Sequence, residues 1–410
     1  MRILHTSDWH LGARLTNGES RIEEQKQVLE EICRIADERD VQLIVISGDV
    51  YHHYNPSTEA ENLFYRTLAH LSHRGERAVA VIAGNHDNPE RLCVAEPFYF
   101  AHGILIVGGY GHSFSLPDSA EIKDLGGNCF IVKTRMMSEA AVIAALPHAS
   151  EGRLRATYES ITGKDGAGYA DALKHLFSES EKRFEKGAVN ILASHLFVMG
   201  GAYAGDELKG TAIGGTEGVP LSAFPAGADY CALGHLHRPQ LLGRNGTIAY
   251  CGSPLQYHLD GGGKRCVFLV NIRPGEKAAV SEIPLTSGKA MACWQAEDFD
   301  QALQFCRSDR DRGAWILLKV MVKEPLKPSQ VAELRAERGN DLFAVMPMYP
   351  DAVMGEERPD IAGLKDEELF TEFYKTKMKH EPSRQVVELF LRLSAEAGAS
   401  GEGEDETSLA

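Results

Sequence analysis

The chain has 410 residues, of which 43% are hydrophobic and 25% are charged, proportions that are ordinary for a soluble globular protein. Its formal net charge at pH 7 is −15, which argues against a protein that binds nucleic acid through its overall charge. Any contact with nucleic acid would need a local basic patch or a divalent metal ion. The length predicts two or three domains.

Eight cysteines are spread along the chain, and no two have the C-x-x-C spacing that is typical of a zinc or redox site. We expect reduced thiols that pack as small hydrophobic side chains, which indicates the cytoplasm as the compartment. The first residues run into a strand pattern without a basic, apolar leader, and no apolar run approaches the length of a membrane-spanning helix. We therefore expect no signal peptide and no association with a membrane.

Three apolar segments near the N-terminus predict buried parallel strands with helices between them. This β-α-β-α-β order predicts an α/β fold in which helices cover a sheet. The strands are expected at residues 2–7, 42–47 and 78–83, and the helices at residues 20–39 and 58–74.

Polar residues follow each of these strands directly. The third strand leads into Gly84, where a glycine allows the chain to turn sharply. Residues two apart on an extended segment point to the same side, so Asp8 and His10 can converge beyond the first strand. The polar residues are Asp8 and His10 after the first strand, Asp49 after the second, and Asn85, His86 and Asp87 after the third.

Two later strands repeat this arrangement. Residues 189–193 end in Ser194 and His195, and residues 229–233 lead into His235 and His237. The glycine-rich segment 199–218 is expected to be a mobile surface loop. The other segments are interpreted as strands or connections at 104–107, 128–132 and 141–146, a helix at 168–185, and strands at 247–254 and 266–272 that complete a second sheet.

The pattern changes after residue 275, so the first domain is expected to span residues 1–275 and a small α+β domain residues 276–355. Residues 356–363 are interpreted as a polar linker, two amphipathic helices are expected within residues 364–397, and the acidic tail 398–410 is expected to be disordered. Within the small domain, strands are expected at 279–285, 314–322 and 342–346, and helices near 298–307 and 328–337.

The polar strand ends predict one site, because ligands of open α/β sheets bind beyond the carboxyl ends of the strands. Together they supply carboxylates, an amide and several imidazoles but no thiolate, a set that suits manganese, iron or zinc. These donors are too many for one ion. Two ions about 3.5–4 Å apart, bridged by one carboxylate, fit better and form a clamp for in-line displacement at phosphorus.

The ordered motifs resemble the calcineurin-like metallophosphoesterase superfamily, and in particular the SbcD nuclease family, the bacterial relatives of the Mre double-strand-break nucleases. The resemblance lies in residues 2–12 (RILHTSDWHLG), 83–87 (AGNHD), 232–238 (ALGHLHR) and 250–254 (YCGSP). It implies a β-sandwich flanked by helices, with a small α+β capping domain and C-terminal helices.

The resemblance also implies two ligand sets that share one carboxylate. By position, Asp8, His10 and His237 would hold the first ion, Asn85, His195 and His235 the second, and Asp49 would bridge them. The implied cofactor is two Mn²⁺ ions per chain, with Mg²⁺ as the alternative.

Three further residues carry implied catalytic roles. His86 would act on the phosphate or the leaving oxygen as general acid and charge stabiliser, without binding metal. Asp87 would orient His86 or cap the following helix. His52 stands where many phosphoesterases have aspartate, and we expect it to pair with His86 or to help place the strand.

Basic residues near the site could meet a phosphate backbone, although an ordinary surface charge is the commoner role for each of them. The candidates are Arg14, Arg21, Arg91, Arg238, Lys264 and Arg265.

The apolar faces of the two helices within residues 364–397 suggest docking onto another protein, rather than packing back onto the small domain. In the family that partner is SbcC, an SMC-like ATPase, and the family also suggests a homodimer within a heterotetramer. The implied activity is double-strand 3′→5′ exonuclease and single-strand endonuclease, which opens hairpins and processes DNA ends in repair, recombination and replication. The alternatives are a phosphatase or cyclic-nucleotide phosphodiesterase on the same scaffold, and a non-catalytic DNA-end scaffold.

Overall fold

The structure is a computed structural model of the whole chain. Its contacts divide the chain into two compact units, Met1–Met321 with Leu326–Pro347 and Val322–Pro325 with Met348–Ala410. We describe each unit by itself. The described residues are 1–111, 121–164, 166–202, 218–243, 246–259, 264–349, 366–378, 381–384, 386–387 and 389–391.

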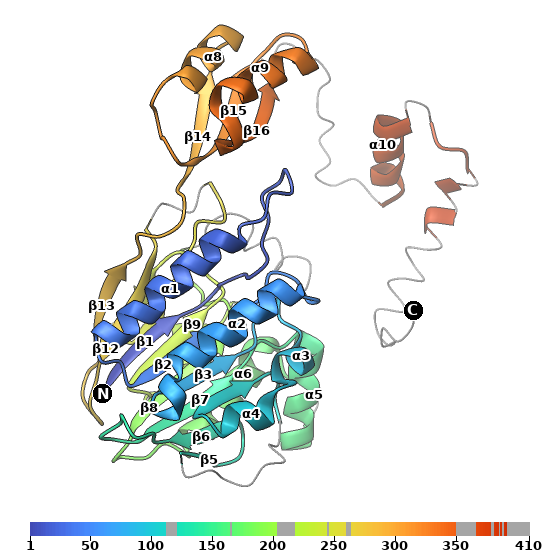
Figure 1. Cartoon of the computed structure of the whole chain (residues 1–410). Helices are drawn as coiled ribbons and strands as arrows, with labels where there is room; N and C mark the ends of the chain where they lie inside the picture. The colour runs from blue at the N-terminus through green and yellow to red at the C-terminus, as the bar shows by residue number, and fades with distance from the viewer. Residues whose placement is uncertain are drawn as a thin grey trace. The chain divides into compact units, whose positions relative to one another are not determined.

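Six of the described strands form the first sheet, in the order β13-β12-β1-β2-β3-β4 (Figure 1). Strands β1 to β4 are parallel, whereas β12 runs antiparallel to β1 and β13 antiparallel to β12. The parallel order follows from the helical crossovers that join these strands. The strands span Arg2–Thr6 (β1), Leu43–Ser47 (β2), Ala78–Ile82 (β3), Ile104–Val107 (β4), Cys266–Asn271 (β12) and Ala279–Pro284 (β13).

Seven of the described strands form the second sheet, in the order β10-β11-β9-β8-β7-β6-β5. Its central strands β7, β8, β9 and β11 are parallel, and the outer pairs are antiparallel. The strands span Ile122–Asp124 (β5), Cys129–Val132 (β6), Ala141–Leu146 (β7), Val189–His195 (β8), Tyr230–Gly234 (β9), Gln240–Leu242 (β10) and Ile248–Tyr250 (β11).

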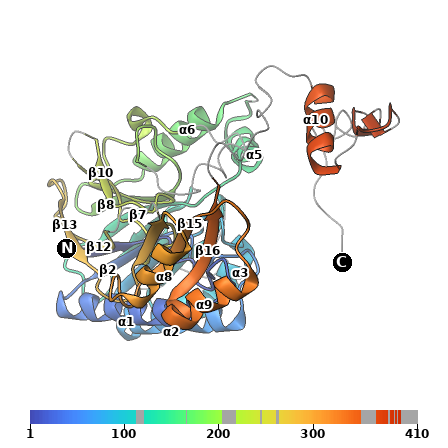
Figure 2. The same cartoon turned by 90° about the horizontal axis from the view of Figure 1, so that it is seen from above.

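Helices cover both outer faces of the paired sheets. Figure 2 shows α1 (Ile22–Glu38) and α2 (Thr58–Leu71) on one side and α5 (Glu151–Thr162) and α6 (Tyr169–Glu181) on the other. Alternate residues of the strands pack on opposite faces of the sheet: Leu4 lies in the core beneath α1 and α2, whereas Ile3 lies between the two sheets. The short helices of this part are η1 (His73–Gly75), α3 (Pro89–Cys93), α4 (Glu96–Phe100) and η2 (Leu221–Ala223).

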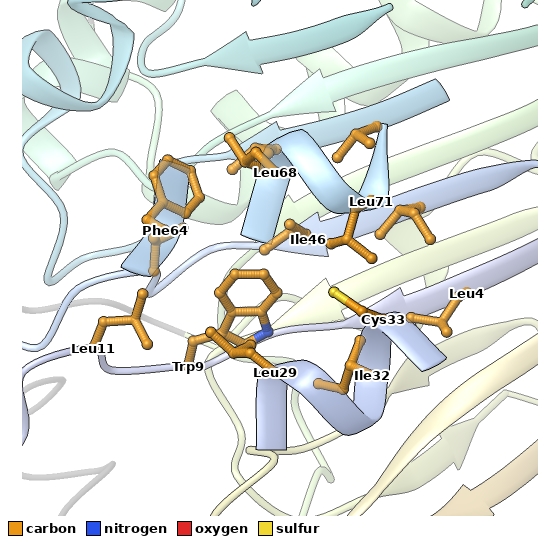
Figure 3. Packing of buried hydrophobic residues seen from close by; sticks show 14 of the residues in the cluster. Leu4, Trp9, Leu11, Leu29, Ile32, Cys33, Ile46, Phe64, Leu68 and Leu71 are labelled. Atoms are coloured by element: carbon orange, nitrogen blue, oxygen red, sulfur yellow. The ribbon is translucent and has the colours of Figure 1, made fainter. Parts of the chain in front are cut away.

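Trp9, directly beside the predicted site, is part of the core under α1 and α2. Figure 3 shows it between Leu29 of α1 and Phe64 of α2, with the Trp9 and Phe64 rings in edge contact at 6.3 Å. Both side chains are buried. The loop that carries Asp8 and His10 is thus anchored by an apolar contact to two helices.

Replacing Phe64 by alanine is expected to lower the free energy of unfolding by about 3–5 kcal/mol, because the change leaves a cavity in this core. Urea denaturation followed by circular dichroism measures the loss. Tyr54→Ala is the matched control, since Tyr54 is 49% exposed and its replacement should change stability by about 0.5 kcal/mol or less. Equal effects of the two substitutions would contradict this packing.

The small domain contains a three-stranded sheet among the described residues, in the order β14-β15-β16, with β14 parallel to β15. The α8 crossover joins β14 to β15, as a parallel pair requires. Its elements are β14 (Met291–Ala296), α8 (Phe299–Arg307), β15 (Trp315–Met321), α9 (Pro328–Arg338), η3 (Gly339–Asp341) and β16 (Leu342–Met348).

One expectation about this region was wrong. The strand expected at 279–285 in the small domain is β13, which pairs along its whole length with β12 in the first sheet. It is mostly exposed as an edge strand, so its composition differs from that of the buried strands. The sequence pattern also failed to indicate β14, which takes the place of β13 in the small sheet, and helix α5, where Leu154 is the buried residue.

In the second unit, α10 spans Asp366–Met378, where a helix was expected. Phe370 of α10 stacks on Phe390 with ring centroids 4.1 Å apart, so the two expected helices meet through aromatic side chains. The expected linker 356–363, tail 398–410 and most of loop 199–218 lie outside the described residues. None of the helices in the described part of the chain has both the length and the apolar character needed to span a membrane.

Candidate metal centre

The carboxyl ends of strands from both sheets meet at one edge of the sandwich. Asp8 follows β1 and Asp49 follows β2, and the N–H of Asp8 donates to the Gly48 carbonyl at 3.0 Å. His195 ends β8, where it pairs with Gly234 of β9. The N–H of His235 donates to Asp8 Oδ1 at 3.0 Å, which ties the second sheet to the first. Polar residues distant in sequence are therefore gathered as predicted.

The first expected ligand set, Asp8, His10 and His237, offers ligand atoms within 4.8 Å of one another. His10 Nε2 lies 3.1 Å from His237 Nε2, and His237 Nε2 lies 4.0 Å from Asp8 Oδ1. Burial lowers the pKa of His237 to about 3 and that of His10 well below its ordinary value. Both imidazoles are thus neutral near pH 7, the form that binds a metal.

The second expected ligand set comprises Asn85, His195 and His235. Asn85 Oδ1 lies 3.0 Å from His195 Nε2 and 3.1 Å from His235 Nδ1. His195 Nδ1 lies 2.8 Å from the Ser47 carbonyl, so its N–H is used there and Nε2 faces the other ligands. A hydrogen bond of this kind orients a metal-binding histidine.

Asp49 stands between the two sets. Its Oδ2 lies 3.6 Å from His10 Nε2 and 3.5 Å from His195 Nε2. Burial would raise the pKa of this carboxyl, but the nearby His195 and His10 hold it well below its usual range. Burial alone would lower the pKa of His195, yet Asp49 raises it to about 9, so metal binding at His195 would displace a proton.

The donors fit two divalent ions. Neighbouring ligand atoms about 2.1 Å from one ion lie roughly 3.0–3.5 Å from each other, a range that includes the 3.1 Å between His10 and His237 and the 3.0 and 3.1 Å from Asn85 to its two histidines. Two neutral imidazole nitrogens at 3.1 Å share at most one proton, whereas a cation between them would satisfy both. Burial raises the pKa of Asp8 to about 7, and a cation would keep this carboxylate ionised.

Four ligand residues have left-handed backbone conformations, with φ of 53° at Asp8, 45° at His10, 50° at Asp49 and 100° at His235. Such conformations are uncommon outside glycine and cluster at functional sites. Gly84 leaves room for one of these residues, Asp49, because a Cβ at Gly84 would lie 2.1 Å from the Asp49 carboxylate. The backbone is therefore shaped around the ligands.

Comparison with known proteins agrees with this geometry. The sequence model of a family described as calcineurin-like phosphoesterase matches residues 1–239. The chain is 35% identical over 403 residues to a protein of Bacillus subtilis strain 168 that is named as the SbcD subunit of the nuclease SbcCD, covering 96% of this chain and 98% of that protein. The chain belongs to the SbcD family of calcineurin-like phosphoesterases. Two further relatives bear the same name.

The SbcD-family relative from Rhodobacter capsulatus is 34% identical over 259 residues, which are 62% of each chain. The relative from Escherichia coli K12 is 27% identical over 339 residues, which are 80% of each chain. The family resemblance and the fold class are thereby confirmed. The chain is a metal-dependent phosphodiester hydrolase of this family.

His86 lies beside the first ligand set of this SbcD-family site. Its ring is 4.8 Å from that of His10 at 88°, and its Nδ1 lies 2.9 Å from the His52 carbonyl. If Nδ1–H donates there, Nε2 is left for a proton transfer. His52 also stacks on His86 at 5.8 Å, in line with the pairing expected from sequence.

Asp87 has neither of the two roles considered from sequence. Its carboxylate accepts from the backbone N–H groups of Val50, Tyr51 and Gly84 at 3.1, 2.9 and 2.8 Å. The cap of helix α3 is instead Asn88. Asp87 therefore joins the loops after β2 and β3, because a buried carboxylate needs several donors.

The six basic residues considered for contact with DNA differ in burial and pairing. The expectation for Arg21 was wrong: its side chain is 1% exposed and paired with Glu24. Arg265 is half-buried and donates to the carbonyls of Ser287 and Gly288. Arg91 and Lys264 are exposed but paired, Arg91 with Glu61 at 2.7 Å and Lys264 with Glu282 at 3.5 Å. Arg14 and Arg238 are exposed as well.

Two residues near the metal centre were not anticipated from the sequence. Ser7 donates to Asp8 Oδ2 at 2.5 Å and orients that carboxylate. The His148 ring lies 6.2 Å from the His195 ring. His148 follows β7 by two residues, so the strand-end signal would have found it had residues 141–146 been assigned as a strand.

Proposed function

We propose that this chain is the manganese-dependent DNA nuclease subunit of an SbcCD-type complex. The observation that carries the proposal is the placement of Asp49 Oδ2 at 3.5–3.6 Å from a ligand of each set. Such a shared carboxylate suits a two-ion centre that cleaves phosphodiesters. The names of the relatives favour a nucleic acid as the substrate.

In this proposal the bound ions supply an activated water and neutralise charge that develops on the phosphoryl oxygens. Asp8, His10 and His237 would hold one ion, Asn85, His195 and His235 would hold the other, and Asp49 would be shared between them. His86, fixed through Nδ1 on the His52 carbonyl, delivers a proton from Nε2 to the leaving oxygen. Water attack at phosphorus breaks the P–O bond, and the two products leave as an alcohol and a phosphate monoester.

Substrate and partner follow from the same assignment. The activity would combine double-strand 3′→5′ exonuclease with single-strand endonuclease and hairpin opening. Arg238 is the best placed of the basic candidates to meet DNA, because it is exposed and directly follows His237, and exposed Arg14 is a second candidate. The helices within residues 364–397 would dock the SbcC ATPase, and the chain would work as a homodimer within a heterotetramer.

The test is cleavage of a 5′-labelled blunt duplex and a DNA hairpin, with and without the ATPase partner, beside an aryl phosphodiester. Activity on both DNAs in Mn²⁺, its loss with EDTA and its return on adding Mn²⁺ or Mg²⁺ are expected. A ladder of shortening products would report 3′→5′ polarity. Hydrolysis of the aryl diester alone, with both DNAs intact even in the presence of the partner, would indicate a small-molecule phosphodiesterase instead.

A further inference from the structure

Glu24, in the first turn of α1, joins the small domain to the catalytic domain. Its Oε1 accepts from Arg21 Nε at 3.0 Å and from the indole Nε1 of Trp315 at 2.7 Å. Its Oε2 accepts from Arg21 Nη2 at 2.9 Å and from the backbone N–H of Lys289 at 2.7 Å. Four donors thus converge on one buried carboxylate, two of them from residues at or within the small domain.

The neighbouring residue, Gln25, points to the metal centre. Its Nε2 donates to the backbone carbonyl of His10 at 2.7 Å and to the hydroxyl of Tyr257 at 3.0 Å. Its Oε1 accepts from the N–H of Gly12 at 3.0 Å. Tyr257 donates in turn to the Trp9 carbonyl, and its ring lies 5.4 Å from that of His10.

A second series of hydrogen bonds also links the small domain to the loop that carries His10. Arg21 Nη1 donates to the Gln256 carbonyl at 2.5 Å, and Gln256 Oε1 accepts from the N–H of Met291, the first residue of β14. Gln256 adjoins Tyr257 in the chain. The first strand of the small domain is thereby connected to the same tyrosine that holds the loop of His10.

Among the expected metal ligands, His10 is the one whose backbone these hydrogen bonds hold in place. Its φ of 45° is unfavourable for a residue with a side chain and persists only when its surroundings hold it. The Gln25 amide, bound to its carbonyl, is one of those supports. A shift of the first turn of α1 would move Gln25 together with Glu24, because adjacent residues of one helical turn move as a rigid piece.

We propose that Glu24 and Gln25 form a relay, in which the position of the small domain sets the affinity of the first ligand set for its metal ion. Trp315 and Lys289 hold Glu24, and Gln25 holds the strained backbone of His10. Glu24 and Gln25 are positioning residues, since neither contacts substrate or metal. The inference rests on the proposed function, because it presumes metal at the Asp8, His10 and His237 set.

The first test compares two tryptophan substitutions in the full-length chain. Trp315→Phe removes the indole donor to Glu24 and keeps an aromatic ring. Trp294→Phe is the matched control, because the Trp294 indole is also buried and also donates to a carboxylate at 2.7 Å, that of Asp311 within the small domain. Titration with Mn²⁺, following the free ion by electron paramagnetic resonance, reports the affinity of each ion without DNA.

We expect Trp315→Phe to weaken the binding of one of the two ions by about threefold to tenfold, the effect of losing one hydrogen bond. Trp294→Phe should leave both affinities at the wild-type value. Equal affinities in the two variants would overturn the relay. A wild-type chain that binds fewer than two ions would instead contradict the proposed two-ion function, so the two failures are distinguishable.

A double-mutant cycle then tests whether the two ends of the relay are coupled. Gln25→Met removes the donor to His10 and retains the length of the side chain. Since both substitutions interrupt the same connection, the double variant should bind Mn²⁺ about as weakly as the weaker single variant. Fully additive losses would refute the coupling. Glu24→Gln takes the place of Trp315→Phe in the cycle if the latter does not fold.

Discussion

Replacing Asp49 by asparagine is expected to lower the rate of phosphodiester cleavage by at least about three orders of magnitude, because the site loses the carboxylate whose Oδ2 lies 3.5–3.6 Å from a histidine of each ligand set. Asparagine has nearly the same shape and tolerates the left-handed backbone conformation found at residue 49. The lost charge, rather than a changed backbone, is therefore the cause. Single-turnover cleavage of the labelled duplex in saturating Mn²⁺ measures the effect.

Asp40→Asn is the control for this substitution. Asp40 also has a left-handed conformation, with φ of 46°, but it is exposed and pairs with Arg2 at 3.3 Å. Its replacement should leave both cleavage and Mn²⁺ stoichiometry unchanged, as expected for a surface ion pair. An active Asp49→Asn variant that still binds two Mn²⁺ ions would show that the centre does not depend on a shared carboxylate.

Replacing His86 by alanine is expected to reduce cleavage by about 10²–10⁴-fold while the chain keeps its fold and both metal ions. The side chain lies against His10 but belongs to neither ligand set, and its Nδ1 is engaged by the His52 carbonyl. What the variant loses is the proton donor. The measurement is the rate of the single-turnover reaction together with the number of bound Mn²⁺ ions in the same sample. It distinguishes the loss of a proton donor from the loss of a metal ligand.

His53→Ala provides the comparison, because His53 is an exposed neighbour of His52 and has no place in the proposed chemistry. Its replacement should leave the rate near that of the wild type. His10, His52 and His86 also offer nitrogens within 4.8 Å of one another. If His86→Ala lost one bound ion together with activity, His86 would be a metal ligand and its role as proton donor would be wrong.

Much of the metal centre could be anticipated from the order of residues along the chain. Buried parallel strands are continuous apolar runs, and the polar residues that follow them lie at one edge of a sheet, so Asp8, Asp49, Asn85 and His195 could be placed near one another. The chemistry of the side chains then indicated a divalent metal, since carboxylates, an amide and imidazoles are hard or intermediate ligands. These inferences need only local periodicity and the types of the residues.

The contacts between distant segments could not be anticipated in this way. The buried pairing of Arg21 with the Gln256 carbonyl, and of Glu24 with Trp315, joins residues 235 and 291 positions apart. An arginine directly before a helix, as Arg21 is, has the same local pattern whether it meets DNA or a buried carboxylate. Only its burial in the folded chain distinguishes the two.

The difference between what the sequence determined and what only the tertiary structure decided has a physical reason. Strand ends, ligand types and their order depend on hydrophobic periodicity and local turns, which are properties of short stretches of sequence. The sheet that β13 joins, the donors that surround Asp87, and the relay through Gln25 depend on which segments come together when the apolar faces are buried. Those pairings are selected by packing and by the need to satisfy buried polar groups across the whole fold.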